Sequence, residues 1–239
     1  MGGHATEPNT RPGPGERGVF VVVPAYNEGP ALADVLEELA GTYRQVVVVD
    51  DGSTDDTYEV AVGGASYVLR HLVNRGQGAA LQTGIRFALL RGARVIVTFD
   101  ADGQHRAEDM AALVQPILSG ECDITLGSRF LGRAVDMPRS RRAALKAAVV
   151  FSRLMSGVKL SDAHNGLRAF SRRAAERLKI TQDRMAHASE LTDFVARSGL
   201  TYREVPVQIR YTRYSLGKGQ SLRHAVRILI HYLFGRVDS

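Results

Sequence analysis

The strongest constraint on the fold of this chain comes from short, unbroken runs of β-branched and aromatic residues. Residues 19–23 and 46–49 consist entirely of valine and phenylalanine. A strand with one face in water alternates apolar and polar residues, whereas an unbroken apolar run requires that both faces be buried. Such runs are typical of parallel strands covered by helices on both sides, so the sequence favours an α/β protein.

Helical segments separate these runs, and further strand candidates continue the alternation. Strands are expected at residues 67–70, 94–98 and 123–126, and helices at residues 30–40, 55–62, 78–90 and 107–118. In the third helix, one apolar face carries Leu81, Ile85, Ala88 and Leu89. The alternation predicts a doubly wound, Rossmann-like and mostly parallel sheet flanked by helices, with ligands at the carboxyl ends of its strands.

The second half of the chain has a different character. A basic, helix-prone stretch is followed by a polar loop, a helix and a strand, expected at residues 137–160, 161–166, 187–198 and 202–210. In the closing segment, residues 221–236, one helical face carries Leu222, Val226, Leu229 and Leu233. That helix either docks on the sheet or lies on a membrane as a basic amphipathic helix. No repeat or linker divides the chain, so we expect a disordered tail at residues 1–17 and one domain at residues 18–239.

Composition narrows the class of protein. Hydrophobic residues make up 44% and charged residues 23% of the 239 residues, as in soluble globular proteins. The single cysteine, Cys122, excludes an intramolecular disulfide and is expected to be an inert core residue. There is neither an apolar run of the ~20 residues that a membrane span needs nor a signal-peptide core, so we expect a cytoplasmic protein. The net charge of +6 indicates an anionic partner: nucleic acid, a membrane surface or a phosphorylated substrate.

Two carboxylates with one residue between them follow the apolar run that ends at residue 98. If the chain stays extended, Asp100 and Asp102 project to the same side. Placing two like charges together is costly unless a cation neutralises them. Oxygen ligands of this kind suit Mg²⁺ or Mn²⁺, with a substrate's phosphates completing the coordination. The alternative is a loop-start aspartate beside a solvated neighbour.

Polar loops also follow the earlier strands, at residues 24–28, 50–55 and 74–78. In the second loop, Asp50 and Asp51 suit hydrogen bonding to a base and a ribose. The alternative for that loop is a turn in which Ser53 or Thr54 caps the next helix and Asp55 favours its dipole. The third loop contains Gly76 and Gly78 and opens a helix, which suits an anion. Together with the Asp100–Asp102 pair, these loops predict a nucleoside diphosphate site.

The same segments resemble the serial motifs of family 2 glycosyltransferases. The motifs are Pro24-Ala25-Tyr26-Asn27-Glu28, Asp50-Asp51-Gly52-Ser53-Thr54-Asp55, Asn74-x-Gly76-x-Gly78 and Asp100-Ala101-Asp102-Gly103-Gln104-His105. Two more, Gly127-Ser128-Arg129 and Asp162-x-x-x-Gly166-x-Arg168, are similar to the dolichyl-phosphate mannose synthase and polyprenyl-phosphate glycosyltransferase branch. The resemblance spans residues 19–221. It implies a GT-A fold, a nucleotide-sugar donor, a divalent cation and inversion at the anomeric carbon.

The resemblance also implies a role for particular residues. Those that would hold the nucleotide sugar are Pro24, Tyr26, Glu28, Asp51 and Asp100. The metal, Mg²⁺ or Mn²⁺, would be bound by Asp102 and Gln104, with Asp100 close by. Arg213 and Lys218 are candidates to stabilise the leaving diphosphate, the alternative being a solvated basic loop. His105 either orients its loop or takes part in catalysis. In this interpretation residues 18–130 form the nucleotide-sugar-binding half and residues 131–239 the acceptor half.

The acceptor class follows from the chemistry of nucleophiles. A sugar hydroxyl needs a general base, whereas a phosphate monoester, with a second pKa of about 6, is already ionised. Hydroxyl-directed relatives usually carry a Glu-Asp pair in the second half of the chain, and this sequence has none. The nearest acidic residue, Glu190, is expected to be orienting or structural. The missing pair therefore points to a phosphate acceptor.

Arginines gather where that acceptor would approach, namely Arg129, Arg139, Arg141, Arg142 and Arg168. Arginine donates bidentate hydrogen bonds to phosphate. The resemblance favours Arg129 and Arg139 for the acceptor phosphate and as catalytic residues beside Asp102. Arg168 would join them or brace the loop around Asp162 and Asn165. The alternative is that residues 139–142 cap a solvated helix.

The sequence thus predicts an inverting, metal-dependent glycosyltransferase. It would move a hexose from a donor of the GDP-mannose or UDP-glucose type to a polyprenyl or dolichyl phosphate. Because the prenyl chain lies in a membrane, we expect peripheral contact with its cytoplasmic face, through residues 142–160 or 221–234. The alternatives are transfer to a saccharide hydroxyl and a non-catalytic nucleotide-sugar-binding subunit. Nucleic-acid binding is disfavoured because the basic residues surround acidic loops.

Two departures from the family pattern bear on the diphosphate contacts. Gln77 stands where relatives often carry lysine, and Gly219-Gln220-Ser221 replaces a more common Glu-Ser-Lys ending. The sequence does not choose between the guanine and uracil bases or between sugars.

Overall fold

The computed structural model describes residues 18–135, 159–162, 165–181 and 187–211, together with positions 142, 145 and 149. Three predicted segments lie wholly or mostly outside the described residues: the tail at 1–17, the basic stretch at 137–160 and the closing helix at 221–236. In the part of the chain that is described, no helix is long and apolar enough to cross a membrane.

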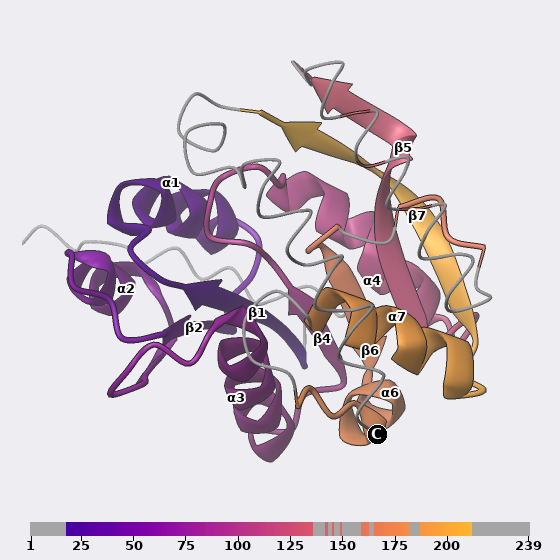
Figure 1. Ribbon diagram of the computed structural model, residues 1–239, viewed down its shortest axis with the longest axis horizontal. Helices are drawn as coiled ribbons and strands as arrows, with labels where there is room; N and C mark the ends of the chain where they lie inside the picture. The colour runs from indigo at the N-terminus through magenta and orange to yellow at the C-terminus, as the bar shows by residue number, and fades with distance from the viewer. Residues whose placement is uncertain are drawn as a thin grey trace, which may run out of the picture.

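A seven-stranded sheet forms the centre of the molecule, in the order β3-β2-β1-β4-β6-β5-β7 (Figure 1). Its strands are β1 Val19–Ala25, β2 Val46–Asp50, β3 Tyr67–Arg70, β4 Val95–Thr98, β5 Ile124–Val135, β6 Arg168–Ser171 and β7 Tyr202–Arg210. Strand β6 is antiparallel to both of its neighbours, β4 and β5, and the other pairs are parallel. The mostly parallel α/β sheet is therefore confirmed.

The sequence analysis did not find β6 or the short helix α6, Arg172–Arg177, that follows it. The strand is only four residues long and contains no β-branched residue, so its intrinsic strand preference is weak. Its place between β4 and β5 is decided by tertiary pairing, in which Phe170 lies opposite Ile96 on one side and Ile124 on the other.

Helices cover both faces of the sheet (Figure 1). The remaining helical elements are α1 Gly29–Ala40, α2 Thr57–Gly64, α3 Gln77–Leu90, the 3₁₀ turn Ala107–Asp109, α4 Met110–Leu118 and α7 His187–Arg197. One apolar layer contains the buried residues of α1 and α4, and the other contains those of α3, α6 and α7. This is the doubly wound arrangement that the alternation of strands and helices predicted.

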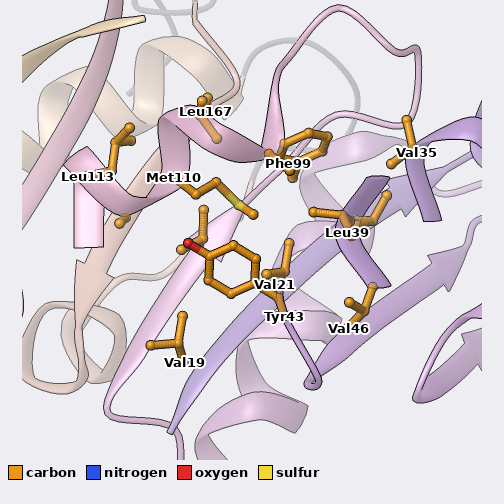
Figure 2. Packing of buried hydrophobic residues seen from close by; sticks show 14 of the residues in the cluster. Val19, Val21, Val35, Leu39, Tyr43, Val46, Phe99, Met110, Leu113 and Leu167 are labelled. Carbon is orange, nitrogen blue, oxygen red and sulfur yellow. The ribbon is translucent and has the colours of Figure 1, made fainter. Parts of the chain in front are cut away.

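Strand β1 shows why an unbroken apolar run was required. Val19, Val21 and Val23 face the layer of α1 and α4, whereas Phe20 and Val22 face the layer of α3. Figure 2 shows Val19 and Val21 packed in the first layer with Tyr43, Phe99 and Met110 among the labelled side chains. Because successive residues of a strand point to opposite faces, burial of both faces leaves no position for a polar side chain.

Helix α3 approaches the sheet closely because of one glycine. A Cβ atom added at Gly84 would lie 2.4 Å from Val22 Cγ1 and 3.1 Å from Val49 Cγ2. The predicted apolar face packs beside it: Leu81, Ile85 and Ala88 are buried, and Leu89 is half-buried against the same layer. The absent side chain therefore lets α3 rest directly on β1 and β2.

Cys122 lies in the core, as predicted. Its side chain belongs to the layer of α1 and α4. Burial, together with the charge of Glu121, raises the pKa of its thiol, so the reactive thiolate is disfavoured.

We predict that Gly84→Ala destabilises the protein by about 1–3 kcal/mol, because the added methyl group overpacks the contact between α3 and β1. Gly63→Ala, also in a helix, is the matched control, since a Cβ atom there meets nothing within 4 Å. The control should be neutral or stabilising by up to about 1 kcal/mol, because alanine is the better helix former. Urea unfolding of the two variants measures both values, and equal stabilities would contradict the packing argument.

Candidate functional site

The loops after β1 and β2 are fastened to each other by hydrogen bonds. The backbone N–H of Asn27 donates to Ser53 Oγ at 2.9 Å, and the N–H of Thr54 donates to Asn27 Oδ1 at 2.9 Å. The N–H of Glu28 donates to Thr57 Oγ1 at 2.8 Å. These contacts hold Asn27 in the left-handed region, at φ 52°. The two loops therefore form one rigid rim at the carboxyl edge of the sheet.

Ser53 and Thr54 do not cap the following helix, so the alternative interpretation of this loop is wrong in that respect. Helix α2 starts at Thr57, and its N-cap residue, Asp56, makes no side-chain cap. Asp55 instead accepts hydrogen bonds from the N–H and the hydroxyl of Thr57. Burial alone would raise the pKa of Asp55, but these hydrogen bonds lower it.

Asp50 and Asp51, adjacent in sequence, perform different tasks. Asp50 is fully buried, accepts the N–H of Ser53 at 3.0 Å and lies 3.0 Å from Arg70 Nε. The guanidinium of Arg70 also stacks 4.5 Å from the centre of the Tyr58 ring. Asp50 therefore braces its own loop.

Asp51 reaches the next loop, the one between β3 and α3. Its Oδ1 lies 2.6 Å from Nδ1 of His71 and accepts the N–H of Arg75 at 3.0 Å, while its Oδ2 accepts the N–H of Gly76 at 2.6 Å. Gly52 permits this approach: its φ is +75°, and a Cβ atom there would lie 2.9 Å from the backbone carbon of Val73. The first three loops are thus one connected unit.

The predicted acidic pair lies in one cluster after β4. Asp100 Oδ1 accepts the side-chain amide of Gln77 at 2.9 Å, and its Oδ2 lies 3.0 Å from Nε2 of His105. Asp102 accepts the N–H of Gln104 at 3.0 Å and its side-chain amide at 2.5 Å. Burial and then the negative charge of Asp100 raise the pKa of Asp102. The two carboxylates are therefore close enough to repel each other.

This cluster fits a divalent cation. Burial and mutual repulsion both disfavour two ionised carboxylates, and a cation would relieve both. Within the described ranges no group of three or more His, Cys, Asp or Glu residues could hold a metal by itself. Asp100, Asp102 and Gln104 would thus supply part of a coordination shell, which phosphate oxygens complete in the manner usual for Mg²⁺.

The loop around Gly166 closes over Asp100. A Cβ atom at Gly166 would lie 2.0 Å from Asp100 Oδ2, so only glycine fits there with the carboxylate in place. The carbonyl of Gly166 accepts the hydroxyl of Thr98 at 2.7 Å. Residues 66 positions apart in the chain, Asp100 and Gly166, are thereby brought into direct contact.

Arg129, expected at the acceptor phosphate, lies in a buried network. Its Nε lies 2.6 Å from Asp162 Oδ2, which also accepts the backbone N–H of Arg129 at 3.1 Å. Its Nη1 donates to the hydroxyl of Tyr211 at 2.8 Å. Burial alone would lower the pKa of Arg129, but Asp162 and Tyr211 raise it. The guanidinium is therefore charged and firmly oriented.

Arg168 is buried and interacts through its charge with Asp100, Asp162 and Arg129. Burial lowers its pKa, while the charges of Asp100 and Asp162 oppose that effect and Arg129 adds to it. Asp162 forms its direct ion pair with Arg129, and Arg168 also interacts with Asp162 through its charge. Arg168 therefore links Asp100 electrostatically to Asp162 and Arg129.

The other predicted site residues fall into two groups. Pro24 is buried at the end of β1, Tyr26 is 43% exposed and Glu28 is half-buried beside it. Arg139, Arg213 and Lys218 lie outside the described residues. The expected structural role of Glu190 agrees with its contacts, since its carboxylate accepts the N–H and the hydroxyl of Thr181.

Sequence reasoning missed His71 and Tyr211. His71 directly follows a predicted strand, so its position at the ligand edge of the sheet was the available signal. Tyr211 follows β7 in the same way, but nothing in its neighbourhood in sequence indicates its bond to Arg129.

Acidic side chains and buried arginines at the carboxyl ends of a mostly parallel sheet define an α/β protein suited to a phosphorylated ligand with a divalent cation. Comparison with protein families agrees: the model of glycosyl transferase family 2 matches residues 20–179. The chain belongs to this family and is a glycosyltransferase with a GT-A fold.

Curated relatives lie in the branch that the motifs resembled. A UDP-N-acetylglucosamine–dolichyl-phosphate N-acetylglucosaminyltransferase of Methanococcus voltae is 30% identical, over 90% of this chain and 94% of the relative. A polyprenol monophosphomannose synthase of Mycolicibacterium smegmatis is 31% identical, over 92% of this chain and 88% of the relative. An undecaprenyl-phosphate mannosyltransferase of Micrococcus luteus is 32% identical, over 79% of this chain and 82% of the relative.

Solved structures share the fold at lower identity. Glucosyl-3-phosphoglycerate synthase from Mycobacterium tuberculosis, in complex with Mn²⁺, UDP-glucose and phosphoglyceric acid, matches with a TM-score of 0.71. The identity is 23%, and the match covers 97% of this chain and 86% of that one. This likeness supports the GT-A architecture.

We predict that Asp162→Ala costs about 3–5 kcal/mol of folding free energy, because it leaves the buried charge of Arg129 without its partner. The matched control is Glu121→Ala, which breaks the exposed pair with Arg203, whose side chains are 55% and 60% exposed. The control should cost less than about 1 kcal/mol. Denaturant unfolding compares the two, and a loss at Asp162 no larger than that at Glu121 would contradict the described network.

Proposed function

We propose that this glycosyltransferase moves a hexose from a nucleoside diphosphate to a polyprenyl phosphate, with inversion and with a divalent cation. One observation carries the proposal: the Gly166 loop lies on Asp100, and the buried Arg168, two residues further along, interacts through its charge with Asp100, Asp162 and Arg129. Arginines suited to an anion are thus coupled to a carboxylate suited to a metal-bound diphosphate, as transfer between two phosphates requires.

On the donor side, Asp100, Asp102 and Gln104 would hold Mg²⁺ or Mn²⁺, and the cation would supply the positive charge that stabilises the diphosphate leaving group. Pro24, Tyr26, Glu28 and Asp51 hold the nucleoside, while Arg213 and Lys218 contact the diphosphate. The connected loops after β1, β2 and β3 support this assignment, since a rigid rim positions the donor before the reaction.

On the acceptor side, Arg129, Arg139 and Arg168 orient the phosphate. An acceptor phosphate oxygen forms a bond to the anomeric carbon from the face opposite the leaving group. The bond from that carbon to the diphosphate oxygen breaks, and its electron pair leaves with the nucleoside diphosphate. No proton has to be removed from an ionised phosphate monoester, so the chain needs no general base.

The comparisons support the acceptor class and the cation. The relatives of Methanococcus voltae, Mycolicibacterium smegmatis and Micrococcus luteus carry names of enzymes that act on dolichyl, polyprenol or undecaprenyl phosphates. Structures of the Mycobacterium tuberculosis synthase contain Mn²⁺ with UDP or UDP-glucose. A prenyl acceptor implies peripheral contact with the cytoplasmic face of a membrane.

The test offers radiolabelled UDP- and GDP-hexoses with a polyprenyl phosphate, with Mn²⁺ or with EDTA. We expect metal-dependent label in the organic phase, and at least about a 100-fold loss in Asp102→Asn, because several kcal/mol of charge stabilisation are removed. Asp34→Asn, at an exposed position of α1, is the matched control and should keep full activity.

Three outcomes would contradict the proposal. Label found only on a saccharide favours the hydroxyl-directed alternative, and donor binding without any transfer favours a binding subunit. Undiminished turnover by Asp102→Asn would remove the metal assignment.

The acceptor assignment has a separate prediction. Arg139→Ala should raise the apparent KM for polyprenyl phosphate by about tenfold or more, because a charge-assisted hydrogen bond to phosphate is lost, with little change in donor affinity. Arg91→Ala, which removes an arginine that stacks on Tyr67 at the opposite edge of the sheet, is the control. Steady-state kinetics with each substrate varied in turn distinguishes the two effects, and an unchanged acceptor KM would exclude Arg139 from the phosphate site.

A further inference from the structure

The carboxylate of Asp51 has little hydrogen-bonding capacity left. An ionised carboxylate offers about four acceptor positions, two on each oxygen. Nδ1 of His71 and the N–H of Arg75 occupy both positions on Oδ1, at 2.6 and 3.0 Å. The N–H of Gly76 occupies one position on Oδ2, at 2.6 Å. Among the partners that the described residues supply, one position on Oδ2 therefore remains open for a ligand.

Burial also limits the contact that a ligand can make with the Asp51 carboxylate. Only 3% of the Asp51 side chain is exposed, so a ligand reaches one small part of the carboxylate. The occupied oxygen cannot turn outward, because its partners belong to the backbone before α3 and to a histidine held at both nitrogens. Nε2 of His71 lies 3.0 Å from the hydroxyl of Thr83 in α3.

The number of open acceptor positions on Asp51 distinguishes guanine from uracil, the two bases between which the sequence does not choose. Guanine presents two neighbouring donors, N1–H and N2–H, which pair with both oxygens of a carboxylate. Uracil presents a single donor, N3–H, between two carbonyl groups. A carboxylate with one open position satisfies the uracil edge, whereas it leaves one guanine donor without a partner. An unpaired buried donor costs more than its missing bond, because its hydration is lost.

We infer that His71, held by Thr83, makes Asp51 a single-acceptor site and thereby selects a uridine diphosphate donor over a guanosine diphosphate donor. The inference rests on the proposed function in one respect, namely that Asp51 contacts the base. His71 acts through Asp51 and is a positioning residue for donor specificity.

The first experiment uses the full chain with Mn²⁺ and measures nucleotide affinity by calorimetry. UDP should bind about tenfold or more tightly than GDP and than N3-methyl-UDP, which lacks the N3–H donor. Inosine diphosphate keeps N1–H but lacks the amino group of guanine, so it tests the second donor at constant base size. With one acceptor open, GDP should bind no more tightly than inosine diphosphate.

The second experiment changes the acceptor count. His71→Leu removes a donor and opens a second position on Asp51, on Oδ1, so GDP should gain about tenfold over inosine diphosphate. His71→Asn is the matched control, because its side-chain amide N–H replaces Nδ1–H and should keep the wild-type order of affinities. Thermal unfolding of both variants checks that the fold is intact, and if His71→Leu does not fold, the wild-type ligand series decides alone.

Two results would overturn the inference: GDP binding more tightly than both UDP and inosine diphosphate, or N3-methyl-UDP binding as well as UDP. Neither result affects the proposed function, which is judged by label transferred to polyprenyl phosphate from any donor. Conversely, a preference for UDP without transfer would contradict the proposed function and leave the base selectivity standing.

Discussion

Negative charge concentrated at one edge of the sheet is the constraint on which the rest of the site depends. Asp50 is the last residue of β2 and Asp51 follows it, while Asp100 and Asp102 follow β4; β2 and β4 are the two strands that flank β1. Each carboxylate is met by donors from another loop or from its own turn: Arg70, the N–H groups before α3, Gln77 and Gln104. The loops are rigid because these carboxylates would otherwise be buried without partners.

The need to pair buried charges also connects the two halves of the chain. Strand β6 enters between β4 and β5 and places Arg168 opposite both Thr98 and Leu126. The buried charge of Arg168 interacts with those of Asp100 and Asp162, and Asp162 in turn orients Arg129. Asp100, Arg168, Asp162 and Arg129 are therefore parts of one electrostatic network, which joins the loop after β4 to strands β5 and β6.

Much of the fold could be predicted because a strand that is buried on both faces requires an unbroken run of apolar residues, which is visible in the sequence. The runs at β1 and β2, and the apolar face of α3, were found for this reason. Strand β6 left no such trace, since Arg-Ala-Phe-Ser has neither alternation nor β-branching, and its partners are far away in the chain. Strand β5 runs to Val135, well past the predicted end at residue 126, because it continues beside β7 through an irregularity between Ser128 and Arg133.

By itself, the sequence determined the class of sheet, the edge of the sheet at which the polar loops lie and the residue types gathered there, because strand ends and charged motifs are local properties. Only the tertiary structure decided which partners those residues have. It separated Asp50, a brace, from Asp51, which reaches the loop before α3, and it paired Asp162 with Arg129. Hydrogen-bond capacity is shared among loops distant in the chain, so how much of it remains for a ligand is a property of the folded molecule alone.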